Sequence, residues 1–179
     1  EKKEFKKAID NYKKFLEKNP NDNISRFNLS WCYFATSDLN NAFKFYEFRK
    51  EKTIPKPKTI EVKNKFNPSE WTGENINNKK ILIISEQGIG DTIQFFRYLY
   101  TIKEYYNSEI IFYTDKNLKY LFKDTPFNIV SDLNNISNID YYQNLLSLPG
   151  IFFKKNGKIQ KCINYISIEK LKKMTIYKI

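Results

Sequence analysis

The feature that most constrains this chain is an apolar run that leads directly into a glycine-containing loop and then a helical pattern. The run at residues 80–85 reads Lys-Ile-Leu-Ile-Ile-Ser, and aliphatic residues without alternation are typical of a strand buried on both faces of a parallel sheet. Gly88 and Gly90 follow, and apolar residues at helical spacing predict a helix over residues 91–106. Open α/β sheets bind ligands at such turns, because backbone N–H groups and a positive helix end converge there.

The rest of the C-terminal half continues this rhythm. Further strands are predicted over residues 109–114, 128–131 and 139–142, with a helix over residues 116–122. Alternating strands and helices predict a parallel sheet with right-handed crossovers. We therefore expect a Rossmann-like α/β domain over residues 79–179.

Residues 1–49 have a different, wholly helical pattern. Ala8 and Tyr12 recur 34 residues later as Ala42 and Tyr46, and 34 residues is the length of a tetratricopeptide repeat. The segment resembles one and a half such repeats, and we expect further repeats upstream because a stack needs about three to be stable. A plain helical hairpin with an aromatic core is the alternative. The expected fold class is thus α plus α/β.

Between these halves the pattern lapses. Residues 50–78 include Ile54-Pro-Lys-Pro57, and prolines bias their predecessors toward extended backbone. We interpret this stretch as a linker, or as an arm packed along the second domain.

Composition excludes several classes of function. The net charge is +11, but the lysines are scattered among acids and amides instead of forming one basic stripe, so we expect no nucleic-acid partner. No apolar run approaches the roughly 20 residues of a membrane span.

The two cysteines, Cys32 and Cys162, lie far apart and favour a reducing, cytoplasmic location. The absence of histidine excludes His-dependent catalysis and His-ligated metals within this chain.

Four sequence blocks in one order carry a family resemblance. They are Glu47-Phe-Arg49, Trp71-Thr-Gly-Glu74, the stretch Glu86–Tyr98 and Leu146-Ser-Leu-Pro149. This order resembles bacterial proteins in which tetratricopeptide repeats are fused to a heptosyltransferase-like glycosyltransferase domain of the GT-B kind.

The resemblance implies two Rossmann-like halves facing across a cleft, the first holding a glycan or protein acceptor and the second a nucleotide-sugar donor. By this resemblance we expect the chain to cover the last repeats and the first half only. We therefore expect no bound cofactor, no metal, no activity of this chain alone, and a possible protein partner at the repeats.

Asp91 is the candidate catalytic residue. Inverting sugar transfer needs a base that takes a proton from the acceptor hydroxyl, and Asp91 matches the glycine-aspartate position where the resemblance places that base. An aspartate after a glycine turn is equally suited to be a helix N-cap, bonded to the N–H of residue 93 or 94. Both interpretations stay open on the sequence.

The other candidate residues are expected to bind substrate. Gly88 and Gly90 allow positive φ and close approach of the backbone to a ligand, and Gln94 shares a helix side with Asp91. The full candidate set is Gln87, Gly88, Gly90, Gln94 and Ser147, with Glu86 as either a ligand contact or a brace of the loop.

Two rival functions remain. One is a non-catalytic tetratricopeptide interaction module with a degenerate α/β domain, and the other is a nucleotide-binding α/β domain of different chemistry.

Overall fold

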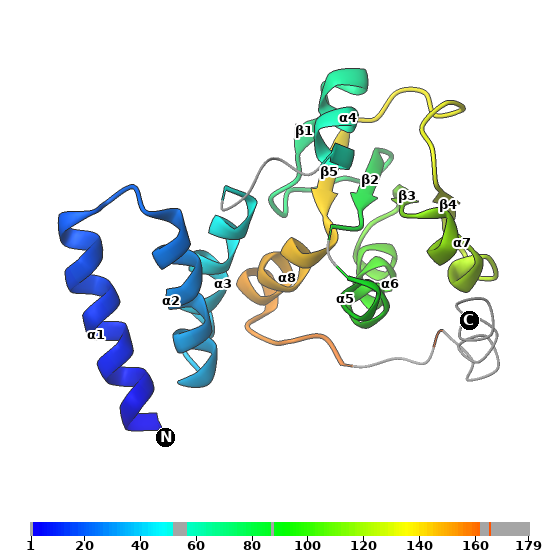
Figure 1. Ribbon diagram of the computed structural model, residues 1–179. Helices are drawn as coiled ribbons and strands as arrows, with labels where there is room; N and C mark the ends of the chain where they lie inside the picture. The colour runs from blue at the N-terminus through cyan, green and yellow to red at the C-terminus, as the bar shows by residue number, and fades with distance from the viewer. Residues whose placement is uncertain (1, 52–56, 87, 162–164, 166–179) are drawn as a thin grey trace, which may run out of the picture. The chain divides into compact units, whose positions relative to one another are not determined.

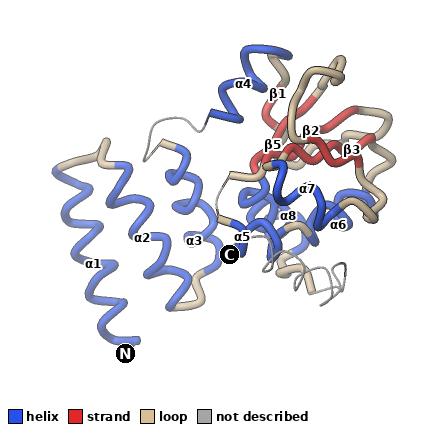
Figure 2. Tube along the Cα trace, turned by 45° about the vertical axis from the view of Figure 1, so that its right-hand side comes forward, coloured by secondary structure: helices blue, strands red, loops and turns tan. Residues whose placement is uncertain are grey.

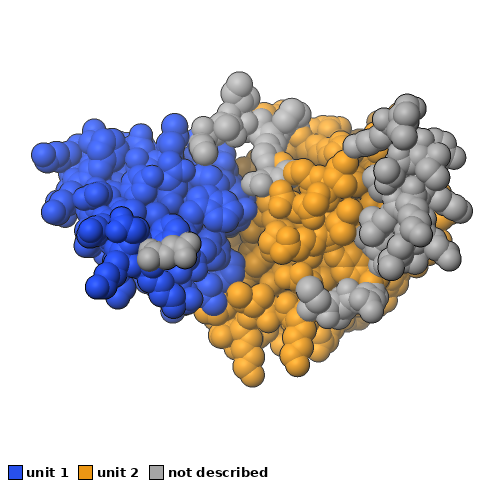
Figure 3. Space-filling view, turned by 60° about the horizontal axis from the view of Figure 1, so that its bottom comes forward, with its two compact units in different colours: residues 1–56 blue, residues 57–179 orange. Residues whose placement is uncertain are grey.

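The computed structural model describes residues 2–51, 57–86, 88–161 and 165 (Figure 1). The chain divides into two compact units, residues 1–56 and residues 57–179, which Figure 3 colours separately. Each unit has its own buried apolar cluster. Helices followed by a parallel sheet with helices confirm the predicted α plus α/β fold class.

The first unit is a helical hairpin with a third helix. Its elements are α1 (Lys2–Lys18), α2 (Asn23–Ala35), α3 (Leu39–Tyr46) and the 3-10 turn η1 (Glu47–Lys50). Asp22 caps α2 by accepting a hydrogen bond of 2.6 Å from the Ser25 N–H, and Asp38 caps α3 in the same way through Asn41. Each cap satisfies one of the free N–H groups at its helix start.

The Glu47-Phe-Arg49 block closes this unit by an ion pair and a ring contact. Arg49, which is buried, donates to Glu47 at 2.7 Å, and its guanidinium lies 4.5 Å from the centre of the Tyr46 ring. Burial opposes ionisation of Glu47, but the charges of Arg49 and Lys50 outweigh it and lower the pKa of this carboxyl. The block therefore stabilises the end of the helical unit.

The second unit is built on a five-stranded sheet in which every pair is parallel, in the order β1-β5-β2-β3-β4. Its elements are α4 (Pro57–Phe66), β1 (Ser69–Glu70), β2 (Lys80–Ile84), α5 (Ile89–Phe95), α6 (Arg97–Tyr105), β3 (Glu109–Tyr113), α7 (Lys116–Phe122), β4 (Asn128–Val130), β5 (Tyr141–Asn144), the 3-10 turn η2 (Leu145–Ser147) and α8 (Leu148–Asn156). The central strand, β2, is buried along four of its five residues, as its unbroken aliphatic run predicts.

Apolar side chains cover both faces of the sheet, and Figure 2 shows α4 on one side of it and α6 and α8 on the other. On the first face, Val62 of α4 packs with Leu82 and Tyr142. On the second face, Phe96 stacks on Phe122 with ring centres 4.0 Å apart. This arrangement is the doubly wound layering expected for a parallel α/β unit.

Two elements differ from the sequence-based expectation. The helix predicted over residues 91–106 is two helices that meet at Phe96, where the backbone tightens to a Leu99 N–H to Phe96 carbonyl bond of 3.0 Å. The strand predicted over residues 139–142 is β5, which begins two residues later, at Tyr141, and continues to Asn144.

The stretch interpreted as a linker contains ordered structure. Residues 57–78 hold α4 and β1, and β1 pairs with β5 through Ser69 and Tyr141. The division between the compact units falls at residues 56 and 57. Residues 57–78 are therefore part of the α/β unit.

Candidate functional site

The strand order places a topological switch point beside β2. The chain runs from β2 to β3 and β4 on one side, and then returns to β5 on the other side of β2. The loops after β2 and β5 both leave the carboxyl edge of the sheet and lead to helices on the same face, since α6 and α8 share one apolar cluster. Ligands of open α/β sheets bind outside the carboxyl ends of the strands. The predicted loop after residue 85 lies at this point.

A hydrogen bond joins the two loops. The Leu146 N–H, in η2, donates to the Glu86 Oε1 atom at 3.1 Å. Of the two roles considered for Glu86, bracing the loop is the one with a visible contact. This bond brings the loop after β2 next to the loop that carries Ser147.

Asp91 does not cap its helix, and the N-cap interpretation is wrong. Helix α5 begins at Ile89, its N-cap is Gly88, and no described side chain caps it. Asp91 is the third residue of the helix and half-buried. Its carboxylate lies near the helix start, where the helix dipole favours a negative charge, and the capping role does not compete with a role as a base.

The two glycines do not adopt positive φ, so that part of the expectation is wrong. Among the described glycines, only Gly73 and Gly157 have positive φ. A Cβ atom on Gly88 would meet only the Asp91 carboxylate, at 3.9 Å, and one on Gly90 would meet nothing within 4 Å. The fold therefore does not require glycine at either position, although glycine within a helix costs up to about 1 kcal/mol relative to alanine.

The remaining predicted residues have different degrees of exposure. Gln94 is exposed on α5, one helical turn after Asp91. Ser147 is buried, at 3% exposure. Gln87 lies outside the described residues.

The structure adds four polar side chains at the same edge, which sequence reasoning missed. Ser85 follows β2, Asn144 ends β5, and each is 5% exposed. Lys58 and Thr59, from the first turn of α4, contact them. The Lys58 Nζ donates to the Ser85 Oγ at 3.1 Å, and the Thr59 Oγ1 donates to the Asn144 Oδ1 at 3.1 Å.

Helix α4 contacts the end of β3 as well. The Lys58 ammonium lies 2.9 Å from the Asp115 carboxylate, and the Tyr113 hydroxyl donates to Glu61 at 2.6 Å. Burial and this bond to Glu61 raise the pKa of Tyr113 well above its ordinary value. The first two turns of α4 thus bridge the carboxyl ends of β2, β3 and β5.

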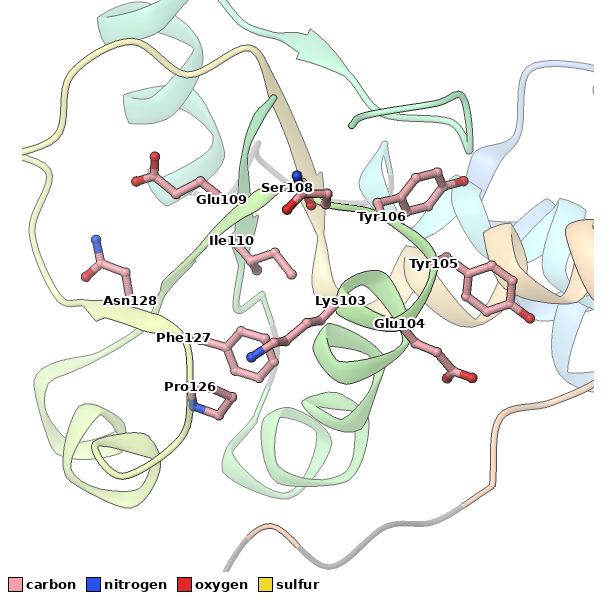
Figure 4. Close-up of a pocket in the computed structure, with 11 residues that line it drawn as sticks. Lys103, Glu104, Tyr105, Tyr106, Ser108, Glu109, Ile110, Pro126, Phe127 and Asn128 are labelled. Carbon is pink, nitrogen blue, oxygen red and sulfur yellow. The ribbon is translucent and has the colours of Figure 1, made fainter. Parts of the chain in front are cut away.

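A hollow of the unit lies at the opposite, amino edge of the sheet (Figure 4). It has a volume of about 660 Å³ and lies between the end of α6 and the starts of β3 and β4. The Phe127 ring on its floor packs against Tyr100, with ring centres 4.8 Å apart, and Figure 4 shows Tyr105 and Tyr106 turned away from it. The hollow therefore offers no open aromatic face, and it is separate from the switch point.

The described residues contain no cluster of three or more His, Cys, Asp or Glu side chains suited to a metal ion. Within the same ranges, no helix combines the length and the apolar character needed to cross a membrane.

Comparison with known proteins gives no family for this chain. No protein-family model, no curated protein and no solved structure matches it.

Proposed function

We propose that this chain is the end of a tetratricopeptide-type repeat array joined to the acceptor-side half of a glycosyltransferase of the GT-B kind. The activity is transfer of a sugar from a nucleotide-sugar donor to a glycan or protein acceptor. The donor is bound by a second α/β half, and the acceptor by the crevice at the carboxyl ends of β2 and β5. A cytoplasmic location belongs to the same proposal, and the buried Cys32 thiol supports it.

The observation that carries the proposal is the position of Asp91 relative to the switch point. The family-like stretch from Glu86 to Tyr98 begins at the loop where an open parallel sheet binds ligands. Within it, Asp91 has no capping role, and the space beside Gly90 is open. A half-buried carboxylate at this position can approach an acceptor hydroxyl and accept its proton.

The test is a transfer assay on the full-length gene product with a panel of radiolabelled nucleotide-sugars. Asp91→Asn keeps the size of the side chain but removes its ability to accept a proton. We expect turnover to fall by roughly 10²–10⁴. The free energy of unfolding should fall by only about 0.3–1 kcal/mol, because the charge near the helix start is lost.

Glu4→Gln is the matched control, since Glu4 is a first-turn carboxylate of α1, in the other unit. It should leave turnover unchanged. Near-normal turnover of Asp91→Asn would remove Asp91 from the mechanism.

A non-catalytic interaction module is the second candidate, and an aromatic surface of the helical unit favours it. Trp31 is 53% exposed on α2, yet its ring packs against Phe27, Phe34 and Tyr46 at centre distances of 5.8–5.9 Å. Exposed, well-supported tryptophans are common centres of protein interfaces. Absence of transfer with every donor, together with a protein partner bound through the helical unit, would favour this candidate.

A further inference from the structure

The first turn of α4 determines which hydrogen-bonding groups at the carboxyl ends of β2 and β5 remain available to a ligand. Lys58 donates to the Ser85 oxygen and Thr59 donates to the Asn144 side-chain oxygen. Because these bonds occupy oxygen acceptors, the Ser85 hydroxyl proton and the Asn144 side-chain NH₂ group remain as donors. Neither has an acceptor among the described residues.

Lys58 adds a further donor to this group. An ammonium has three N–H bonds, and its hydrogen-bonding partners within the described chain are the Ser85 hydroxyl and the Asp115 carboxylate. Ser85 directly follows Ile84, which pairs with Asn144 on the neighbouring strand, and adjacent strands lie about 4.8 Å apart. Three side chains therefore present donors within the span of a small ligand.

Burial shows that these donors are held in place. Ser85 and Asn144 are both about nineteen-twentieths buried, and Lys58 is 22% exposed. Thr114, at the end of β3, is fully buried, and its hydroxyl has no hydrogen-bond partner among the described residues. Polar groups left unsatisfied in this way are unusual in a protein interior and are found where a ligand or water completes them.

Charge decides between an anionic ligand and a neutral one. Four carboxylates stand against three ammonium groups on the first two turns of α4, the loops after β2 and β3 and the starts of α5 and α7: Glu61, Glu86, Asp91 and Asp115 against Lys58, Lys63 and Lys116. A phosphate would be repelled by this surplus. A sugar hydroxyl can accept from Lys58 or Asn144 and donate to a carboxylate at the same time.

We propose that Lys58, Ser85 and Asn144 form a subsite for a neutral carbohydrate at the β2–β5 switch point, with their N–H and O–H groups donating to its hydroxyl oxygens. This inference rests on the proposed function and narrows the acceptor from glycan or protein to glycan. Lys58 is the new binding residue, brought to the edge by a segment that was interpreted on the sequence as a linker or as an arm packed along the second domain.

The experiment is an NMR titration of the ¹⁵N-labelled chain with methyl glycosides of glucose, galactose, mannose and N-acetylglucosamine, with inorganic pyrophosphate as a separate arm. We expect at least one glycoside to shift the Asn144 side-chain NH₂ signals and the Ser85 amide saturably, with a Kd near 1–10 mM, which is about −3 to −4 kcal/mol. Pyrophosphate should not shift these signals.

Lys58→Met keeps the aliphatic stem and should raise the glycoside Kd at least about tenfold, a difference of 1.4 kcal/mol. Lys63→Met is the matched control, because Lys63 is on the same helix but its ammonium lies 5.3 Å from the centre of the Tyr142 ring. This variant should change the glycoside Kd by no more than about twofold. Asn144→Asp keeps the oxygen that Thr59 bonds but removes both donors. With the Ser85 amide as the readout, it should abolish the shift even if Lys58→Met fails to fold.

Three outcomes would overturn the inference: no glycoside binding up to about 100 mM, shifts confined to other residues, or equal effects of Lys58→Met and Lys63→Met. Sugar transfer by the full-length protein without glycoside binding here would retain the proposed function and remove this subsite. Glycoside binding without any transfer would retain the subsite and remove the proposed function.

Discussion

Gly90→Ala should make this protein more stable. A Cβ atom at this position would meet nothing within 4 Å, and the residue lies within helix α5 without a positive φ. Alanine can therefore adopt the native backbone without strain, and it loses less conformational freedom on folding. The expected gain is about 0.4–1 kcal/mol, or about 1–4 °C in Tm for a chain of this size.

Gly157→Ala is the matched control, because Gly157 also has space for a Cβ atom but, unlike Gly90, has a positive φ. A Cβ atom there would also meet nothing within 4 Å, but Gly157 ends α8 with a φ of 66°. An L side chain in that left-handed conformation costs roughly 1–2 kcal/mol. Gly157→Ala should therefore destabilise the second unit by about 1 kcal/mol.

Urea unfolding followed by tryptophan fluorescence measures both variants. The two tryptophans, Trp31 and Trp71, lie one in each unit, so a Trp31→Phe background leaves the fully buried Trp71 as the reporter of the second unit. Loss of stability in Gly90→Ala would refute the conclusion that the fold does not need this glycine. A gain in stability together with a loss of sugar transfer would identify the space beside Gly90 as ligand space, a trade-off typical of functional sites.

Two other predictions test how α4 is held. Because folding raises the pKa of Tyr113, the folded state binds the phenolic proton more tightly than the unfolded state does. The contribution of Tyr113 to the free energy of unfolding should therefore be full below pH 10 and decrease as the pH rises above it. Tyr113→Phe should weaken this alkaline loss of stability in urea unfolding, and an unchanged loss would assign it to other groups. Val62→Ala removes two methyl groups from a fully buried side chain of α4 and should destabilise the second unit by about 1.5–3 kcal/mol. The same variant should make the bonds after Lys63 and Lys65 sensitive to trypsin, and no change in either measurement would mean that α4 does not contribute to this unit.

The sequence by itself determined the elements whose signal is local. The aliphatic run of β2 and the alternation of strands with helices were sufficient to predict a parallel sheet, because burial on both faces selects that composition in each strand separately. The position of Asp91 just beyond the loop at the carboxyl end of β2 followed for the same reason. The break at Phe96 did not, because both halves of the helix have the same apolar periodicity.

Only the tertiary structure decided which residues meet at the switch point. Lys58 and Asn144 lie 86 residues apart in sequence, and neither has a local pattern that marks it as functional. The return of β5 to the side of β2 away from β3, and the packing of α4 against one face through Val62, bring them to the same edge. Whether Asp91 caps its helix likewise depends on where α5 begins. The sequence is compatible with a start at Ile89 or at Thr92, and only the packed structure selects Ile89.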